Sequence, residues 1–236
     1  MVIDFHSHIL PQIDDGSQSL EESIQLLKLE VQQGIHHVVA TPHFYGQHDT
    51  PERFLARRAD AENRLRIEMA QYDGLPQLSI GAEVYFFPGI SDCDALSELT
   101  IAEKSCILIE MPLPPWTDRM YQELEGIWAK QGLTPIIAHI DRYIGPFATQ
   151  GIPERLEQLP VLVQANASFF LRRSTARMAL RMLRQDRIHL LGSDCHNLKT
   201  RPPRMGEALT AIQKHLGQAA IDRINGYSAD IFGEEK

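Results

Sequence analysis

The sequence predicts an α/β fold in which repeated strand–helix units build one parallel sheet. Two observations carry this prediction. Short apolar segments alternate with amphipathic helical segments along the chain, and its 236 residues are a length that single α/β barrels commonly reach. We find no internal repeat and no linker-like change in composition, so residues 1–236 are expected to form a single domain.

Seven short apolar segments are the predicted strands. They are Val2–His6, Val38–Thr41, Leu78–Tyr85, Ser105–Glu110, Thr134–His139, Val161–Ala165 and Ile188–Ser193. The first helix is expected to begin at Ser19, which is spaced from Glu22 as in a capping box, and to end at Gly34. Thr50 and Pro51 are typical of the start of a second helix, which runs to about Gln71.

The second half of the chain contains three further helical segments. Asp118 begins the first of them and Gly132 ends it, and two more are expected near residues 174–184 and 203–216. The proline-rich segments around Pro114 and Pro202 each follow a strand, which favours stiff surface loops over a domain boundary.

Composition excludes several classes of protein. The net charge of −8 disfavours nucleic acid as a partner, because such binding depends on cationic contacts to phosphate. Three cysteines without a CxxC pair argue against a disulfide scaffold and against a thiolate zinc site. No run of 18 apolar residues and no secretory signal occurs, so we expect a cytoplasmic protein without membrane insertion.

Histidine and carboxylate side chains stand at or just after the C-terminal ends of six predicted strands. They are His6, His8, Asp14, Asp15, His43, Glu83, Glu110, His139, Asp141, Asp194 and His196. In βα barrels these ends converge on one mouth. Imidazole and carboxylate without thiolate suit Mn, Fe or Zn. The groups outnumber what one ion needs, so the pattern predicts two or three ions that share bridging carboxylates. Such clusters generate a hydroxide nucleophile and clamp phosphoryl oxygens.

Each of these residues has a simpler interpretation when it is taken alone. A carboxylate at a strand end is commonly a helix cap, and Asp14 and Asp15 precede Gly16 as in an ordinary turn. A single buried histidine is usually a satisfied core residue, which is our interpretation of His36, His37, His48, His189 and His215. Agreement at six strand ends favours the metal centre.

The motifs FHSHIL, DDG, ATPH, GAE, LIEMP, IAHIDR and SDCHN occur in this order between residue 2 and about residue 203. Together they resemble the PHP superfamily of metallophosphoesterases, and most closely its bacterial protein-tyrosine phosphatases of capsular and exopolysaccharide systems. The resemblance implies a distorted, TIM-like (β/α)7 barrel. It also implies three divalent metal ions, foremost Mn, with Fe or Zn as alternatives.

The resemblance assigns a role to each matching residue. His6, His8 and Asp194 would hold one metal ion, Glu83 would bridge to a second ion completed by Glu110 and His139, and Asp15, His43 and His196 would hold the third. Asp14 is the second choice for the position of Asp15. Arg142 and Arg201 match the arginines that bind phosphate, for which a planar guanidinium is suited. Asp141 replaces the usual glutamate, and QANASFF differs from the more polar stretch expected after the sixth strand.

The implied activity is a metal-dependent phosphotyrosine-protein phosphatase. Its substrate would be a tyrosine-phosphorylated bacterial kinase that regulates capsule or exopolysaccharide synthesis, hydrolysed by attack of a metal-bridging hydroxide. Two alternatives are kept: a small-molecule phosphomonoesterase of the histidinol-phosphatase type, and a non-enzymatic scaffold that regulates a kinase. The sequence leaves open peripheral contact with a membrane-bound kinase, a homo-oligomer, and the identity of the kinase and the native metal.

Two further features need an interpretation. Arg173, Arg177, Arg181 and Arg184 form a basic stripe, which is either a solvated face or a docking surface for an acidic phosphotyrosine-bearing tail. Cys195 and Arg201 have the C-x5-R spacing of cysteine-dependent tyrosine phosphatases. The intervening HNLKT lacks glycine, and Cys195 should point away from its neighbours Asp194 and His196, so we expect it to be a packing residue.

Overall fold

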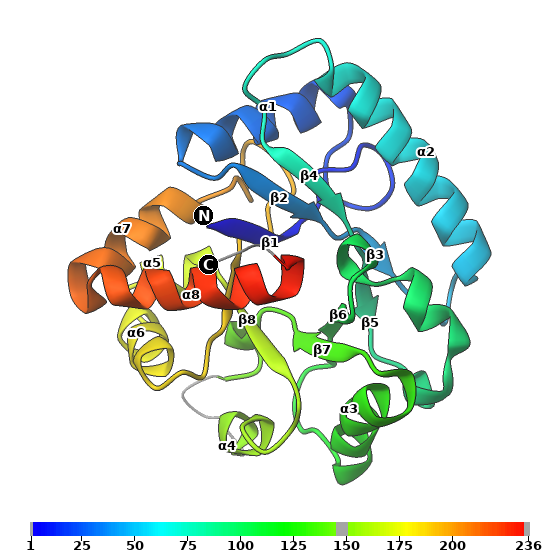
Figure 1. Cartoon of the computed structure of the whole chain (residues 1–236), viewed down its shortest axis with the longest axis vertical. Coiled ribbons are helices and arrows are strands. Elements are labelled where there is room, and N and C mark those ends of the chain that lie inside the picture. The colour runs from blue at the N-terminus through cyan, green and yellow to red at the C-terminus, as the bar shows by residue number, and fades with distance from the viewer. Residues whose placement is uncertain (1, 145–150, 234–236) are drawn as a thin grey trace.

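Parallel strands curl into a barrel wall and helices cover its outside in the computed structural model, which describes residues 2–144 and 151–233 (Figure 1). The strands are β1 (Ile3–Ser7), β2 (His37–Ala40), β3 (His43–Phe44), β4 (Gln77–Ile80), β5 (Glu83–Tyr85), β6 (Cys106–Glu110), β7 (Thr134–Ile137), β8 (Leu162–Asn166) and β9 (Leu190–Gly192). The α-helices are α1 (Leu20–Gln32), α2 (Pro51–Met69), α3 (Asp118–Gln131), α4 (Ile152–Leu156), α5 (Ala167–Leu171), α6 (Ala176–Arg184), α7 (Met205–Leu216) and α8 (Gln218–Phe232). Short 3-10 helices are η1 (Ile90–Asp92), η2 (Asp94–Glu98), η3 (Ile101–Glu103) and η4 (Ile140–Arg142).

The strands pair in the orders β1-β2-β4 and β3-β5-β6-β7-β8-β9, and every pair is parallel. The first and last strands also meet, because the His8 N–H donates to the Cys195 carbonyl at 2.9 Å and the Asp194 N–H donates to the His6 carbonyl at 2.7 Å. Counting β2 with β3 and β4 with β5 as bent strands leaves seven positions around the ring. The predicted distorted barrel of parallel strands is therefore confirmed.

One predicted strand is broken. Leu78–Tyr85 was expected to be continuous, but it divides into β4 and β5 at Gly81 and Ala82. The Gly81 N–H donates to the Ala40 carbonyl at 2.8 Å, and a Cβ on Gly81 would lie 3.0 Å from Ile101 Cγ1. Backbone and a neighbouring side chain therefore approach each other closely here, where glycine permits a bend in the strand.

The helix-start signals are mostly confirmed. The Ser19 hydroxyl accepts from the Glu22 N–H at 3.1 Å, but the Glu22 carboxylate accepts from the Gln18 N–H rather than completing the capping box. Thr50 caps α2, and Gly132 follows α3 in the left-handed region at φ 66°. Helices α4, α5 and α8 were not predicted from the sequence. The first two of them are only five residues long.

The barrel interior changes character along its length. Its amino-terminal part is apolar and contains Ile3, Phe5, Leu108 and Ile136, against which Phe232 of α8 packs. The carboxyl ends of the strands instead carry buried histidines and carboxylates. The apolar part closes one end of the barrel, so the polar groups gather at the other. Within the described residues no helix has both the length and the apolar content needed to cross a membrane.

Candidate metal centre

Glu83, at the start of β5, lies at the centre of the predicted ligands. Its Oε1 is 2.8 Å from Nε2 of His139. Its Oε2 is 3.2 Å from Nε2 of His6, 3.3 Å from Nε2 of His8 and 2.9 Å from Nδ1 of His43. The two oxygens face different histidines, which is the arrangement that a bridging carboxylate needs.

Asp194, just after β9, faces the same group from the other side. Its Oδ1 lies 3.6 Å from Nε2 of His6 and 3.5 Å from Nε2 of His8. The same oxygen is 2.7 Å from Nη2 of Arg201, while Oδ2 is 3.1 Å from Nη2 of Arg142. Strand ends that are nearly 190 residues apart in the sequence therefore converge, because β1 and β9 are neighbours in the closed ring.

The two aspartates of the DDG motif lie in different places. Asp15 is largely exposed, and its Oδ1 is 3.4 Å from Nε2 of both His43 and His196. Asp14 lies behind His8, where Oδ2 is 2.8 Å from Nδ1 of His8 and accepts the His43 N–H, and Oδ1 accepts the Gly16 N–H. Its oxygens already have partners. The geometry favours Asp15 as a ligand and Asp14 as the residue that orients His8.

Three sets of ligand atoms at this mouth, each within 4.8 Å of one another, could hold a metal ion. They are His6–His8–Asp194, His8–Asp15–His43–His196 and His43–Glu83–Glu110. His139 lies beside the last set, with its Nε2 3.4 Å from Oε1 of Glu110. The sets share His8 and His43, so the boundaries between them differ from the division implied by the resemblance, although the same nine residues are involved.

Four buried ligand atoms of this cluster make no well-aligned hydrogen bond with the described residues. They are Oε2 of Glu83, Oδ1 of Asp194, Nδ1 of His43 and Nε2 of His196. Two short contacts, from Nδ1 of His43 to Oε2 of Glu83 at 2.9 Å and from Nη2 of Arg201 to Oδ1 of Asp194 at 2.7 Å, are ion-pair contacts. Buried polar atoms without a partner are uncommon in proteins and costly. Four that converge on one region, all of them nitrogen or carboxylate oxygen, fit the donor set of divalent transition metals.

The pKa values of three predicted ligands also indicate that positive charge stabilises this cluster. Burial would raise the pKa of Glu83, but the charge of His6, the hydrogen bond from His139 and the close contact with His43 hold it well below its ordinary value. Burial would lower the pKa of His8, but Asp14 and Glu83 raise it to about 10. The pKa of His139 likewise rises to about 9, because hydrogen bonds to Glu110 and Glu83 outweigh burial. Metal ions binding here would displace protons from the imidazoles.

Backbone strain accompanies two of the predicted ligands. His139 and Asp194 adopt positive φ angles of 32° and 53°, a region that residues other than glycine rarely occupy. Each such conformation costs on the order of 1–3 kcal/mol and typically persists at functional sites. Gly192, just before this segment, allows close packing, since a Cβ there would lie 2.5 Å from Cβ of His6.

Two polar residues that support the cluster, Gln164 and Asn166, were not identified from the sequence. The Gln164 side-chain carbonyl accepts the His139 N–H at 2.6 Å, and the Asn166 amide donates to Oδ2 of Asp194 at 2.9 Å. Asp141 accepts the Asn166 N–H at 3.1 Å, so it braces β8 rather than reaching toward a substrate. Gln164 and Asn166 lie two apart on one strand, which is the signal that could have found them.

An open pocket of about 550 Å³ adjoins the centre. Its walls include Asp15, His43, Tyr45, Arg53 and Arg57. The Tyr45 ring is 38% exposed, and its centroid is 5.2 Å from that of His43. A planar group can therefore reach the ligand cluster beside an aromatic wall.

Comparison with known proteins finds relatives that match nearly the whole chain. Residues 2–230 match the family model described as "Capsular polysaccharide synthesis, CpsB/CapC". The chain is 32% identical over 233 residues to the tyrosine-protein phosphatase CpsB of Streptococcus pneumoniae, covering 92% of this chain and 91% of that protein. It is 30% identical over 226 residues to the tyrosine-protein phosphatase YwqE of Bacillus subtilis, covering 92% and 85%.

The chain belongs to the CpsB/CapC family.

Two solved structures have a fold similar to that of this chain. A chain from the crystal structures of YwqE of Bacillus subtilis and CpsB of Streptococcus pneumoniae, described as metal-dependent tyrosine phosphatases, aligns with a TM-score of 0.82 at 24% identity. That alignment covers all of this chain and 96% of the other. Histidinol phosphate phosphatase of Lactococcus lactis, solved with zinc, L-histidinol and phosphate, aligns with a TM-score of 0.58 at 15% identity, covering 90% and 93%. The fold is thus that of a PHP-type barrel.

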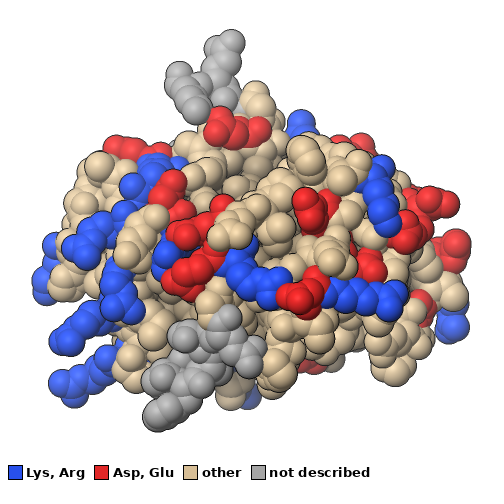
Figure 2. All heavy atoms as spheres, turned by 90° about the horizontal axis from the view of Figure 1, so that it is seen from below, with Lys and Arg blue, Asp and Glu red and all other residues tan. Residues whose placement is uncertain are grey.

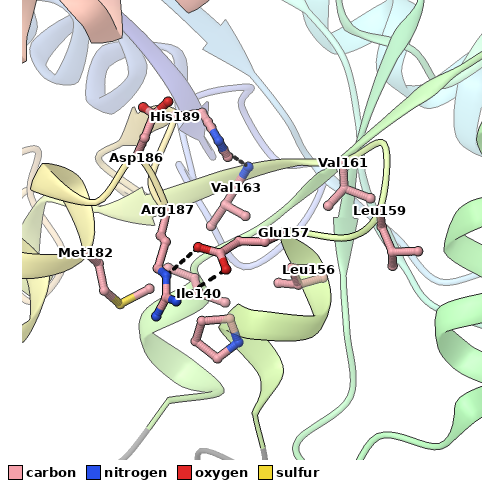
Figure 3. A pocket seen from close by; sticks show the side chains of 11 residues that line it. Ile140, Leu156, Glu157, Leu159, Val161, Val163, Met182, Asp186, Arg187 and His189 are labelled. Carbon is pink, nitrogen blue, oxygen red and sulfur yellow. Dashed lines mark hydrogen bonds and ion pairs between the residues drawn. The ribbon is translucent and has the colours of Figure 1, made fainter.

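A separate cavity of about 250 Å³ lies between α4, α6 and β8 of this CpsB/CapC protein (Figure 3). Its charged side chains already have partners: Arg187 pairs with Glu157, Asp186 pairs with Arg223, and Nδ1 of His189 accepts the Val163 N–H. It contains none of the predicted ligands. The strand-end cluster therefore remains the candidate functional site.

The remaining histidines and Cys195 lie outside the cluster. His37 and His189 are buried or half-buried and hydrogen-bonded, but His36, His48 and His215 are exposed, so the expectation of core positions was wrong for these three. The pattern of single histidines does not distinguish a core residue from a surface one. Cys195 is fully buried in the hydrophobic core, and burial holds the pKa of its thiol well above the ordinary value.

Proposed function

We propose that this CpsB/CapC-family protein is a metal-dependent phosphotyrosine-protein phosphatase. Its substrate is a tyrosine-phosphorylated bacterial kinase that regulates capsule or exopolysaccharide synthesis. The observation that carries the proposal is the strand-end cluster, in which imidazole and carboxylate ligand atoms from six strand ends lie within a few ångströms of one another and four buried ones make no well-aligned hydrogen bond with the described residues. The names of the relatives, which are tyrosine-protein phosphatases, supply the class of substrate.

The cluster fits three divalent ions, foremost Mn. We assign as their ligands His6, His8, Asp15, His43, Glu83, Glu110, His139, Asp194 and His196. When bound, such ions would acidify water to give a nucleophile and stabilise the charge on phosphoryl oxygens. Their six positive charges exceed the charge of the four carboxylates in the set, so the mouth attracts a phosphate ester although the whole chain carries −8.

Arg142 and Arg201 hold the phosphate group in this proposal. Both guanidinium groups lie on the cluster carboxylates, with Nη1 of Arg142 2.8 Å from Oε1 of Glu110 and Nη2 of Arg201 2.7 Å from Oδ1 of Asp194. Their side chains remain 36% and 37% exposed, so N–H groups are left to face a ligand in the mouth. A guanidinium can bind two phosphate oxygens at once, which fixes the orientation of the ester.

The leaving group explains why the site can function without a dedicated acid. A tyrosyl oxygen has a pKa of about 10, so it departs as phenolate with little help from proton transfer. The pocket beside Tyr45 and His43 has room for an aromatic ring close to the ligand cluster. An aryl phosphate therefore suits this site.

Hydrolysis of a phosphotyrosyl peptide by chelated and by Mn-reconstituted protein tests the proposal, with metal content measured alongside. We expect activity to follow metal content and to disappear after chelation. Activity that persists in metal-free protein would refute the proposal. Parallel rates on histidinol phosphate distinguish the alternative small-molecule phosphatase, which would prefer that substrate. Mn-loaded protein inactive on every phosphate ester would support the scaffold alternative.

A further inference from the structure

Five arginines around α6 differ from the other arginines of the chain. Twelve of the 17 have an ion pair or a side-chain hydrogen bond with the described residues. The five without such a partner are consecutive among the arginines of the sequence and all exposed. We call them the α6 arginine face: Arg172, Arg173, Arg177, Arg181 and Arg184.

The helix beneath this face fixes its orientation. Ala179, Met182 and Leu183 of α6 are buried in the hydrophobic core, so the opposite side of the helix must face solvent. Arg177 and Arg181 lie one turn apart on that side, where like charges repel each other. Five cations without a counter-charge in the part of the chain that the structure describes are unexpected, because the whole chain has a net charge of −8. These arginines therefore do not stabilise the folded protein through ion pairs within the described residues.

The α6 arginine face lies close in sequence to the catalytic mouth. Helix α5 begins directly after Asn166, whose side chain bonds Asp194 in the ligand cluster, and Arg172 follows the last residue of α5. Figure 2 shows blue side chains gathered on the left of the molecule, which is the side of α6 in Figure 1. The α6 arginine face therefore begins just after a helix that starts at a strand end of the mouth.

We propose that the α6 arginine face binds an acidic segment of the phosphotyrosyl protein substrate, at a distance from the phosphate itself. This inference rests on the proposed function. Guanidinium groups bind carboxylates in a two-pronged geometry, so a run of aspartates and glutamates is complementary to the face. From Arg177 to Arg184 the helix rises about 10 Å, which three or four residues of an extended peptide would span.

An anionic membrane is a weaker candidate for the same surface. Helices that lie on membranes insert an apolar face, whereas the apolar face of α6 is buried within the protein. Large exposed hydrophobic side chains among the described residues lie elsewhere, at Tyr45, Ile67, Tyr72, Leu113, Trp128 and Leu198. A polypeptide partner needs no such anchor.

The test compares the double variant Arg177→Glu/Arg181→Glu with wild type on three substrates. These are p-nitrophenyl phosphate, a phosphotyrosyl peptide with neutral flanks, and one with an acidic run on one side. For the acidic peptide we expect KM to rise roughly tenfold at low salt with kcat unchanged, because two attractive charges become repulsive. The other two substrates should be unaffected, and the difference should shrink at high salt.

A control variant carries the same change in net charge at other places. Lys28→Glu/Lys104→Glu reverses one cation on α1 and one before β6, and we expect it to leave all three KM values close to wild type. Equal losses on all three substrates in the α6 variant, or equal effects of the two variants on the acidic peptide, would overturn the proposal. So would loss of binding to anionic vesicles by the α6 variant together with an unchanged KM for the acidic peptide.

A binding measurement separates this proposal from the proposed function. An acidic peptide with phenylalanine in place of phosphotyrosine should bind wild type more tightly than the Arg177→Glu/Arg181→Glu variant. That result needs no catalysis, so it would stand even if the protein hydrolysed no phosphotyrosine. Equal binding to both proteins would remove the α6 arginine face as a docking site while leaving the metal-dependent activity untouched.

Discussion

Glu83 is the residue on which the candidate centre depends most. Its oxygens approach four imidazoles, at 2.8 Å for His139, 2.9 Å for His43, 3.2 Å for His6 and 3.3 Å for His8. Glu83→Gln keeps the shape but removes the charge, so we expect metal content to fall and turnover to drop by at least about 100-fold. Metal analysis and phosphotyrosyl-peptide kinetics on the purified variant check this. Full occupancy with near-normal turnover would contradict the bridging role.

Asp194 and Cys195 are adjacent but have opposite surroundings. Asp194 faces the imidazoles of His6 and His8, whereas Cys195 lies in the core with the pKa of its thiol raised by burial. A thiolate nucleophile is therefore unavailable at neutral pH. We expect Cys195→Ser to keep most activity and Asp194→Asn to lose it, measured on an aryl phosphate with metal content checked. An inactive, metal-replete Cys195→Ser protein would instead support thiolate chemistry.

At the residue scale, the location of the candidate ligands could be predicted from the sequence, because imidazoles and carboxylates recur at strand ends. The nine predicted ligands all lie at one mouth, because imidazoles and carboxylates at the ends of parallel strands share an edge. The positions of Asp14 and Asp15 could not be separated by pattern, since both precede Gly16. Their difference arises from the turn itself, which directs Asp14 toward His8. Gln164 and Asn166 were missed because amides carry no metal signal.

At the scale of elements, tight packing of β9 against β1 positions the histidines. A Cβ on Gly192 would lie 2.5 Å from Cβ of His6 and 2.7 Å from Nε2 of Gln164. Gly192→Ala should therefore displace β1 or β9, lower metal affinity and cost roughly 1–3 kcal/mol of unfolding free energy. Denaturant titration and metal analysis measure both effects.

Gly226 on α8 provides the matched control for this substitution. No atom lies within 4 Å of the Cβ position there, so Gly226→Ala should stabilise the helix by up to about 1 kcal/mol and leave metal content unchanged. A Gly192→Ala protein that behaves like Gly226→Ala would show that this close approach does not set the geometry of the site.

The elements that sequence reasoning placed well are those with both a periodic apolar face and a marked end. Helix α3 ends before Gly132 as expected, because Gly132 adopts the left-handed conformation that stops a helix. Helix α8 has Ile221 and Ile224 buried with helical spacing and ends at a left-handed Gly233, but it was missed, and only Gly217 separates it from α7. The break between β4 and β5 depends on contact with Ile101, which is distant in sequence and invisible to local patterns.

At the scale of the whole molecule, one buried acidic pair joins the barrel to its outer layer. Asp4 of β1 and Glu30 of α1 are both fully buried. Burial raises the pKa of both, and the charge of Asp4 raises that of Glu30 further, well above its ordinary value. Burial beside a second carboxyl therefore favours the protonated form of Glu30. Asp4 accepts N–H groups from His6 and Ser193, which lower its pKa against the effect of burial.

This pair predicts how global stability depends on pH. Because the folded pKa of Glu30 is raised, its contribution is fully present below the unfolded pKa of about 4.3 and is lost as pH rises toward the folded value. Glu30→Gln keeps a neutral donor beside Asp4 without needing that proton. We therefore expect it to raise the free energy of unfolding more at pH 8 than at pH 5. Denaturant unfolding of both proteins at the two pH values, at constant metal concentration, measures this difference. A loss of stability in the variant that is equal at both pH values would show that Glu30 is ionised in the folded protein.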